Sequence, residues 1–249
     1  MNEKDEIKQR YDYFAEVAEG EVGKISRLYS GISPTRKYFQ KRKIEAAVSL
    51  GGFEKGMRIL EIGSNMGQYT TLLAKRGFSM VGIDLSDKAI EVAKTAAKEH
   101  HLENIEYYPM DAEDLHLFDD GTFDGVVSFS TLRYVPNLAK ALKEIYRVTK
   151  KNGVVALDFP NKHCPWFRIL KNKFGVENHI YDHFYSAKEL QELFKDAGFT
   201  GIESKKILFT HYTFNPKYLK LYKAVDFIGE RTFFIKELAA IVFCKGVKG

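Results

Sequence analysis

The sequence of 249 residues predicts an α/β fold with a doubly wound, mostly parallel seven-stranded sheet, an N-terminal helical cover and an insertion after the fifth strand. Three observations predict this class. From Met57 onward, short apolar runs rich in Val, Ile and Phe alternate with longer amphipathic segments. The runs are continuously apolar, as in strands that a parallel sheet buries on both faces. Capping residues mark the ends of several amphipathic segments, and this order is typical of right-handed βαβ units.

The first 160 residues contain four expected helices and five expected strands. The helices are Lys37–Leu50, Gly67–Arg76, Asp87–His100 and Leu138–Thr149. The strands are Arg58–Ile62, Ser79–Ile83, Ile105–Tyr108, Gly125–Phe129 and Val154–Phe159. Ser86 stands where an N-cap is favoured, and Gly77 and Gly153 stand where a left-handed C-cap is favoured.

The remaining residues begin with an irregular, aromatic and basic segment at 161–185. Ser186 and Glu189 form a capping-box pattern that opens a helix ending at Gly198. A strand over Ile202–Tyr212, a helix from Asn215-Pro216 and a last strand over Ala239–Lys245 complete the pattern. We expect residues 1–50 to form a helical cover and 51–249 to form the catalytic domain, with 161–185 and 213–236 as substrate-side cover elements.

Composition excludes several classes of protein. With 38 basic and 33 acidic residues, the net charge of +5 permits an anionic partner without the concentrated charge of a nucleic-acid binder. Cys164 and Cys244 stand far apart, which excludes a zinc-finger fold and a disulfide scaffold. The N-terminus does not resemble a signal peptide, and the apolar run Leu238–Cys244 is too short to span a membrane, so we expect a cytoplasmic location.

The most informative segment is Ile59–Thr70, where Gly63 and Gly67 bracket a turn between a strand and a helix. Glycines permit close approach of a ligand, and the helix N-terminus offers free N–H groups. Asp84 and Asp111 end the next two strands, so three strand ends converge on one nucleoside-sized ligand. A dinucleotide and S-adenosylmethionine both fit this arrangement. The spacing is not GxGxxG, and Glu61 suits a sulfonium amino acid better than a pyrophosphate.

Five segments together resemble the motif series of class I S-adenosylmethionine-dependent methyltransferases with a Rossmann-like fold. They are Ile59–Thr70, Gly82–Asp84, Met110–Ala112, Phe123-Asp124 and Gly153–Ala156. The similarity is strongest to the subgroup that includes the ubiquinone- and menaquinone-biosynthesis enzymes, and it covers about residues 30–200. It implies the fold and the cofactor more specifically than it implies a substrate.

The resemblance also implies roles for individual residues. Glu61, Gly63, Ser64, Asn65 and Gly67 form the loop under the methionine part of the cofactor, and Phe129 lines the pocket beside it. Asp84 binds the ribose, Leu85 packs on the adenine, and Asp111 with Ala112 meets the adenine edge. Arg36 belongs to a Pro-x-Arg segment that holds the cofactor carboxylate, and Tyr13 belongs to a cover segment from which it reaches the sulfonium.

The sequence departs from this family pattern at two places. Asn65 replaces the middle glycine of the loop, which is tolerable because Asn accepts left-handed backbone. After the fourth strand, Ser130–Tyr134 replaces the acid-x-x-acid-His metal cluster of the ubiquinone O-methyltransferases. This segment offers no hard-oxygen ligand set, so we expect no metal and regard a quinone substrate as open.

Methyl transfer from a sulfonium requires alignment and needs a base only if the acceptor must lose a proton. His163, His179 and His183, all in the irregular segment, are the candidate bases, and we place His179 and His183 among the catalytic residues together with Tyr13 on the cover, which reaches the sulfonium by the resemblance. The i, i+4 spacing of His179 and His183 also fits a metal pair if they lie on a helix. Surface or structural roles are the simpler interpretation for these histidines.

Aromatic and basic residues recur in 161–185 and again in 214–228. They fit a surface that meets lipid headgroups, a stacking surface for RNA, or, most simply for 216–230, a helix that packs its apolar stripe on the sheet. We expect a methyltransferase for a small or lipid-like organic acceptor that works by direct displacement, without a nucleic-acid partner and with peripheral membrane contact as an option. The alternatives are an RNA or protein methyltransferase and a non-catalytic S-adenosylmethionine-binding regulatory protein. The oligomeric state stays open.

Overall fold

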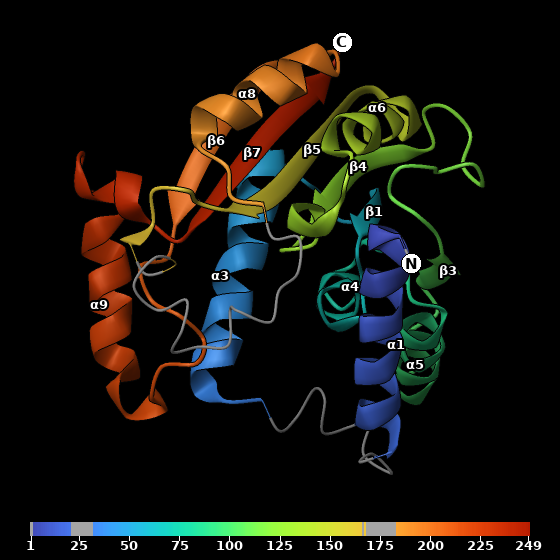
Figure 1. Cartoon of the computed structure of the whole chain (residues 1–249), viewed down its shortest axis with the longest axis horizontal. Coiled ribbons are helices and arrows are strands. Elements are labelled where there is room, and N and C mark those ends of the chain that lie inside the picture. Colours follow the sequence, from blue (N-terminus) through green and yellow to red (C-terminus); the bar gives the residue numbers. More distant parts are fainter. Residues whose placement is uncertain (1, 21–31, 166, 168–182) are drawn as a thin grey trace.

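The computed structural model describes residues 2–20, 32–165, 167 and 183–249, and it contains the predicted seven-stranded sheet (Figure 1). The strands are β1 (Arg58–Ile62), β2 (Ser79–Asp84), β3 (Ile105–Pro109), β4 (Phe123–Ser128), β5 (Thr149–Pro160), β6 (Phe199–Ile207) and β7 (Ile241–Lys248). Their spatial order is β3-β2-β1-β4-β5-β7-β6. Only β7 runs antiparallel to its neighbours, which confirms the mostly parallel, doubly wound prediction.

The strand order reverses between β1 and β4, because the chain proceeds outward from β1 to β3 and then returns to the other side of β1. Loops that leave the carboxyl ends of β1 and β4 therefore diverge and leave a crevice between them. Open parallel sheets bind their ligands at such a switch point. The topology thus places the glycine loop after β1 at the position that favours ligand binding.

Helices cover both faces of the sheet. The face that carries Ile59 and Met80 packs against α3 (Pro34–Gly51), α4 (Gln68–Ala74) and α5 (Asp87–Glu99). The face that carries Leu60 and Val81 packs against α6 (Leu138–Val148) and α8 (Ala187–Asp196). Ser86 caps α5 through the backbone N–H of Ala89, as predicted.

The N-terminal helix α1 (Glu3–Gly20) lies outside these layers and packs on α5 (Figure 1). Its Ala15 is buried with Ala89 and Val92 of α5. Ser86 donates a hydrogen bond from its hydroxyl to Asp12, at 2.5 Å. These contacts hold α1 over the carboxyl ends of β2 and β3.

The two ends of the segment 161–185 meet at the end of β5. Tyr185 N–H donates to the carbonyl of Pro160, and Lys162 N–H donates to the carbonyl of Tyr185. The Asn161 side chain donates to the carbonyls of Glu237 and Ala239, at 2.8 and 2.7 Å. The capping box at Ser186 and Glu189 then starts α8, as the sequence predicts.

Two local predictions are wrong. Gly153 does not provide the left-handed turn after α6, because Asn152 takes that conformation, with φ of 63°, and Gly153 lies within β5. Strand β6 ends at Ile207 and not at Tyr212, because Leu208 adopts a left-handed φ of 64°. Both corrections reflect the tolerance of the backbone for single left-handed residues outside glycine.

The prediction that the apolar stripe of the helix near 216–230 packs on the sheet is also wrong. Asn215 and Pro216 start a short 3₁₀ helix, η3 (Pro216–Tyr218), which leads into α9 (Leu219–Gly229). Leu221, Phe227 and Ile228 of this helix are exposed. Its inward face instead carries Asp226 and Gly229, and α9 stands at the side of the molecule next to α3 (Figure 1).

Within the described part of the chain, no helix combines the length and the apolar character needed to cross a bilayer.

Candidate active site

The turn after β1 is a backbone cradle built on glycine. Gly63 and Gly67 have φ of 75° and 81°, and Asn65 between them has φ of 48°. A Cβ on Gly63 would lie 2.1 Å from the Thr131 side chain, and one on Gly67 would lie 2.3 Å from the Tyr107 hydroxyl. Neither glycine position can therefore accept a side chain without displacing its neighbours. Asn65 takes the left-handed conformation that the sequence predicts for it.

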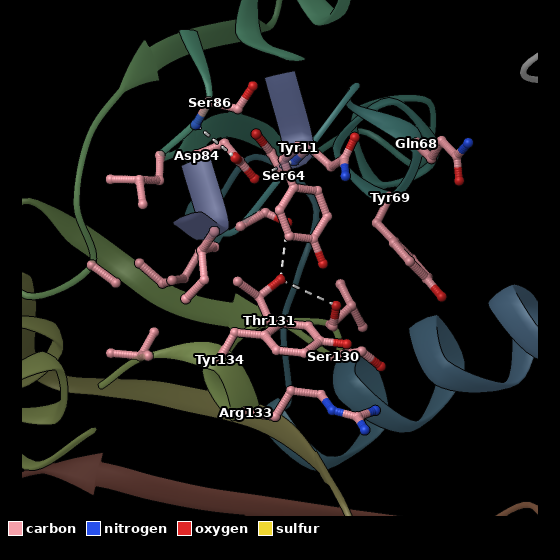
Figure 2. A pocket seen from close by; sticks show the side chains of 18 of the residues that line it. Tyr11, Ser64, Gln68, Tyr69, Asp84, Ser86, Ser130, Thr131, Arg133 and Tyr134 are labelled. Carbon is pink, nitrogen blue, oxygen red and sulfur yellow. Dashed lines mark hydrogen bonds between the residues drawn. The ribbon is translucent and has the colours of Figure 1, made fainter. Parts of the chain in front are cut away.

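Asp84 connects the cradle to the end of β2 (Figure 2). Its carboxylate accepts the backbone N–H of Asn65 at 2.8 Å and that of Ser86 at 3.0 Å. Burial raises the pKa of Asp84, and these two N–H groups act against that shift. Each carboxylate oxygen keeps a lone pair for a further donor. Asp84 and Leu85 both line the central cavity.

Glu61 lies buried beneath the cradle. One carboxyl oxygen, Oε2, accepts the Thr70 hydroxyl at 2.5 Å, while Oε1 and the nearby Ser64 hydroxyl are buried with no hydrogen-bond partner in the described structure. Burial raises the pKa of Glu61 to about 8. Unsatisfied buried polar atoms beside a cradle that excludes side chains fit a polar ligand held there.

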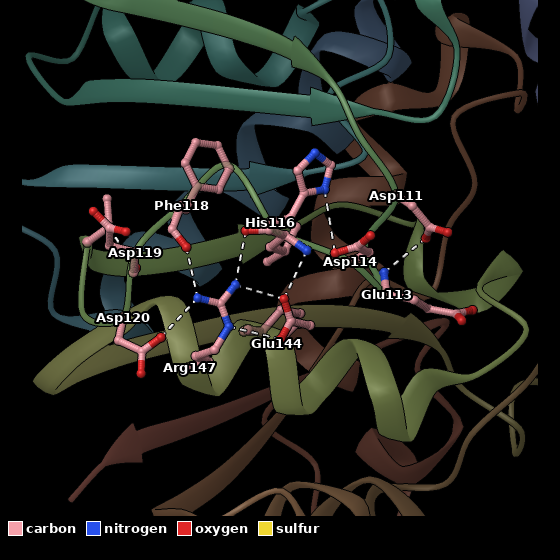
Figure 3. Close-up of polar contacts among 12 residues, drawn as sticks. Asp111, Glu113, Asp114, His116, Phe118, Asp119, Asp120, Glu144 and Arg147 are labelled. Atoms are coloured by element: carbon pink, nitrogen blue, oxygen red, sulfur yellow. Dashed lines mark hydrogen bonds and ion pairs between the residues drawn. The ribbon is translucent and has the colours of Figure 1, made fainter.

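Asp111 and Ala112 follow β3 and form the next part of the cavity wall. Lys4 of α1 lies 2.6 Å from the Asp111 carboxylate and 2.8 Å from that of Glu113. Beyond Asp111, Arg147 of α6 holds the loop by donating to the carbonyls of Phe118 and Leu115, at 2.8 and 3.0 Å (Figure 3). The position of Asp111 is therefore fixed from two sides.

The cavity has a volume of about 640 Å³, within the range of small-molecule sites. Its cofactor-side wall is the cradle with Asp84 and Asp111. Its other walls are largely aromatic and come from α1, α3, α4, the loop after β4, residue 167 and the loop after β6. The aromatic wall consists of Tyr11, Phe14, Phe39, Tyr69, Phe129, Tyr134, Phe167, His211 and Tyr212.

A buried ion pair lies behind the aromatic wall. Lys43 of α3, 1% exposed, contacts the Asp158 carboxylate of β5 at 2.6 Å and donates to the Ser130 hydroxyl at 2.7 Å. The backbone N–H of Ser130 donates to the other Asp158 oxygen. Burial lowers the pKa of Lys43 and raises that of Asp158, and the contact between them opposes both shifts. The pair thus fixes Ser130, which lines the cavity with a left-handed φ of 60°.

The end of the cavity near the loop after β6 is cationic. Arg36 lies over the Tyr212 ring at 4.9 Å, and Arg133 lies over the Phe184 ring at 5.3 Å. Burial and the charges of these two arginines lower the pKa of His211 to about 4, so its ring is neutral at physiological pH. This end presents positive charge and aromatic surface together.

Most of the predicted cofactor residues meet at the cavity. Its lining includes Arg36, Gly63, Ser64, Asn65, Asp84, Leu85, Asp111, Ala112 and Phe129. Glu61 lies below the lining, and Gly67 lies behind it at the start of α4. The segment 213–236 contributes none of the described lining residues and packs one layer outside, on α3.

Of the three predicted catalytic residues, the structure describes Tyr13 and His183, and neither is among the residues that line the cavity. Tyr13 is 61% exposed and is not one of the lining residues, while Tyr11, two residues earlier, lines the cavity (Figure 2). His183 is exposed, outside the described lining. His179 lies outside the described residues. The prediction that Tyr13 and His183 lie at the site is therefore wrong. Lys4, Tyr11 and Ala15 are spaced so that they share one face of a helix, and this spacing could have indicated Tyr11 from the sequence.

The loop after β4 holds Ser130, Arg133 and Tyr134, and all three line the cavity. Among the described residues, no three His, Cys, Asp or Glu side chains lie close enough to hold a metal ion. A cationic and hydroxyl-bearing wall thus stands at this position of the crevice.

Comparison with known proteins agrees with this geometry. Residues 60–157 match the family model of a methyltransferase domain. A demethylmenaquinone methyltransferase of Staphylococcus aureus is 31% identical over 203 residues, which cover 72% of this chain and 81% of that protein. A ubiquinone biosynthesis O-methyltransferase of Alkalilimnicola ehrlichii is 31% identical over 177 residues, covering 68% and 69%.

A crystal structure of a possible histamine N-methyltransferase from Thermotoga maritima has the same fold. Its TM-score is 0.63 at 19% identity, and the match covers 86% of this chain and 91% of that chain. At this identity the likeness concerns the fold alone. Fold, cradle and sequence matches together define a class I S-adenosylmethionine-dependent methyltransferase.

Within this class, the chain belongs to the group that includes the ubiquinone- and menaquinone-biosynthesis methyltransferases. Its methyl donor is accordingly S-adenosylmethionine.

Proposed function

We propose that this enzyme transfers a methyl group to a small or lipid-like organic acceptor by direct in-line displacement. The observation that carries the proposal is one cavity with two chemically different ends. A glycine cradle with two strand-end carboxylates forms one end, and an aromatic, cationic wall forms the other.

We assign the cofactor residues by their place in this cavity. Gly63 and Gly67 shape the cradle, Asp84 accepts the ribose hydroxyls, and Asp111 meets the adenine amino group. Glu61 and Ser64 offer their unsatisfied oxygens to the amino-acid part. The cradle residue Asn65, the adenine contacts Leu85 and Ala112, the carboxylate ligand Arg36 and the neighbouring Phe129 complete the set.

S-adenosylmethionine supplies a methyl group that is already activated toward nucleophiles. The chain's contribution is to align the acceptor and to exclude water. Tyr11 and Phe14 of α1 close one side of the cavity. Tyr69 and Phe129, whose rings stack at 4.3 Å, form a flat apolar wall next to the cradle. No side chain of the described structure has to act as a base in this scheme.

The acceptor end favours an organic molecule with a flat or apolar part. Phe39, Phe167 and Tyr212 supply ring surfaces, and Arg133 supplies positive charge beside them. The relatives named as quinone-biosynthesis enzymes agree with an acceptor of this kind, although residues Ser130–Tyr134 replace the metal cluster of the O-methyltransferases.

The test begins with calorimetric binding of S-adenosylhomocysteine to the wild type, to Asp84→Ala and to Asp114→Ala. Asp114 is an exposed carboxylate three residues from Asp111 whose one ion-pair partner among the described residues is His116, so it is the matched control. We expect binding to survive in the control and to fall at least about tenfold in Asp84→Ala, because two charge-assisted hydrogen bonds are lost. Equal affinity of all three proteins contradicts the assigned site.

Labelled S-adenosylmethionine and lipid extracts then test the acceptor. We expect a labelled product that partitions into organic solvent. Cofactor binding without transfer to any extract favours a non-catalytic binding protein, and transfer only to RNA or protein excludes the small-molecule acceptor.

A further inference from the structure

Helix α9 buries a polar face and exposes its apolar stripe, which is the reverse of an ordinary amphipathic helix. Two carboxylates face inward. Asp226 accepts hydrogen bonds from the backbone N–H of Phe209 at 2.6 Å and from the Tyr38 hydroxyl at 2.9 Å. Glu230 lies 2.6 Å from the Arg42 guanidinium. A Cβ on Gly229 would lie 2.5 Å from the Phe209 ring, so this face touches the loop after β6 closely. Polar anchors therefore fix the orientation of the helix.

The opposite side of α9 is apolar and exposed. Tyr218, Leu221, Val225 and Ile228 follow i, i+3 and i+4 spacing and so share one stripe. Phe233 and Phe234, in the turn that follows residues 230–232 at the end of the helix, are 70% and 81% exposed. We call these six residues the α9 face. A contiguous exposed apolar surface of this kind marks an interaction site.

Charges around the α9 face are almost all positive. Lys217, Lys220, Lys223, Arg231 and Lys236 lie in the same segment, and in the described structure none of them forms an ion pair with a carboxylate. The three acids of the segment are each held within the chain: Asp226 and Glu230 by the anchors above, and Glu237 by Lys206. A partner of the α9 face therefore meets apolar side chains on a segment whose basic residues are not paired with carboxylates in the described structure.

We propose that the α9 face binds the surface of an anionic lipid bilayer. An interfacial helix has this arrangement, with an apolar stripe for the acyl boundary and basic residues for the headgroups. The stripe contains aliphatic Leu221, Val225 and Ile228 as well as aromatic rings, which suits acyl chains better than the stacked bases of RNA. This inference concerns a surface separate from the cavity and does not depend on the proposed acceptor.

The experiment is flotation of the full chain with phosphatidylcholine vesicles, with and without phosphatidylglycerol. We expect binding only to the anionic vesicles. The double variant Phe233→Ser/Phe234→Ser should bind at least about tenfold more weakly, because it removes two inserted rings. Lys217→Gln/Lys220→Gln should lose about fivefold for each charge.

Matched controls lie elsewhere on the surface. Leu117→Ser removes an exposed apolar side chain from the loop after β3, and Lys195→Gln removes an exposed charge from α8. Both should bind vesicles as the wild type does. Binding of S-adenosylhomocysteine without vesicles should be unchanged in every variant, which shows that each is folded and separates this test from that of the proposed function.

Three results overturn the proposal. One is a wild type that floats with neither kind of vesicle. Another is anionic binding that the α9 variants retain in full. The third is a wild-type dimer in sedimentation, or a complex with single-stranded RNA, that Phe233→Ser/Phe234→Ser dissociates while vesicle binding is absent.

Discussion

The buried pair of Lys43 and Asp158 permits a quantitative test of the packing behind the cavity. The substitution Lys43→Met keeps the length of the side chain and removes its charge, so the Asp158 carboxylate stays buried without its cation. Breaking a buried pair from one side costs about 3–5 kcal/mol. For a chain of this size, that corresponds to a fall in Tm of about 6–20 °C.

The second variant, Lys43→Met/Asp158→Asn, removes both charges and keeps an oxygen for the backbone N–H of Ser130. Because neither member is then an unpaired ion, we expect it to regain at least half of the lost stability. Thermal and urea unfolding of the wild type, the single variants and the double variant complete the cycle. The exposed pair Lys162–Glu189 provides the control, and Lys162→Met should cost less than about 1 kcal/mol.

The pH dependence of Lys43→Met has a definite sign. Burial raises the folded pKa of Asp158 above its unfolded value, and without Lys43 that shift is larger. The folded state then binds more protons than the unfolded state between the two pKa values, so the variant loses stability relative to wild type as pH rises through that window. A loss below about 1 kcal/mol, or no recovery in the double variant, refutes the buried-pair interpretation.

Three further predictions concern the cavity wall. Since burial raises the pKa of Glu61 to about 8 from 4.5, stability of the cofactor-free protein should fall between these pH values, and Glu61→Gln should flatten that dependence in thermal scans. His211, with a pKa of about 4, should show no titration in NMR spectra above pH 5, and Arg133→Met should raise its pKa; a midpoint near 6.5 in the wild type contradicts the arrangement. Lys4→Met should speed hydrogen exchange in α1 while costing about 1 kcal/mol or less, and Lys94→Met, an exposed lysine of α5, should change neither quantity.

Local sequence patterns were sufficient for the sheet, the cradle and the cofactor. Strand and helix periods, caps such as Ser86 and the spacing of Gly63, Gly67 and Asp84 all depend on residues close in the chain. In a parallel sheet the strand ends share one edge, so the convergence of Asp84 and Asp111 followed from their positions alone.

Contacts between distant residues decided the rest. Tyr11 and not Tyr13 faces the cavity because Ala15 docks on α5, which sets the rotation of α1. Lys43 and Asp158 are 115 positions apart in the sequence, and no local pattern in either segment predicts their contact.

The orientation of α9 is the clearest case. Hydrophobic periodicity predicts that the apolar stripe faces the sheet. In the structure the stripe faces outward, because Asp226 bonds the backbone of Phe209 and Glu230 pairs with Arg42 on the inward face. Periodicity identifies an amphipathic helix but does not determine which face is buried, because that depends on the free energy of contacts that only the folded chain brings together.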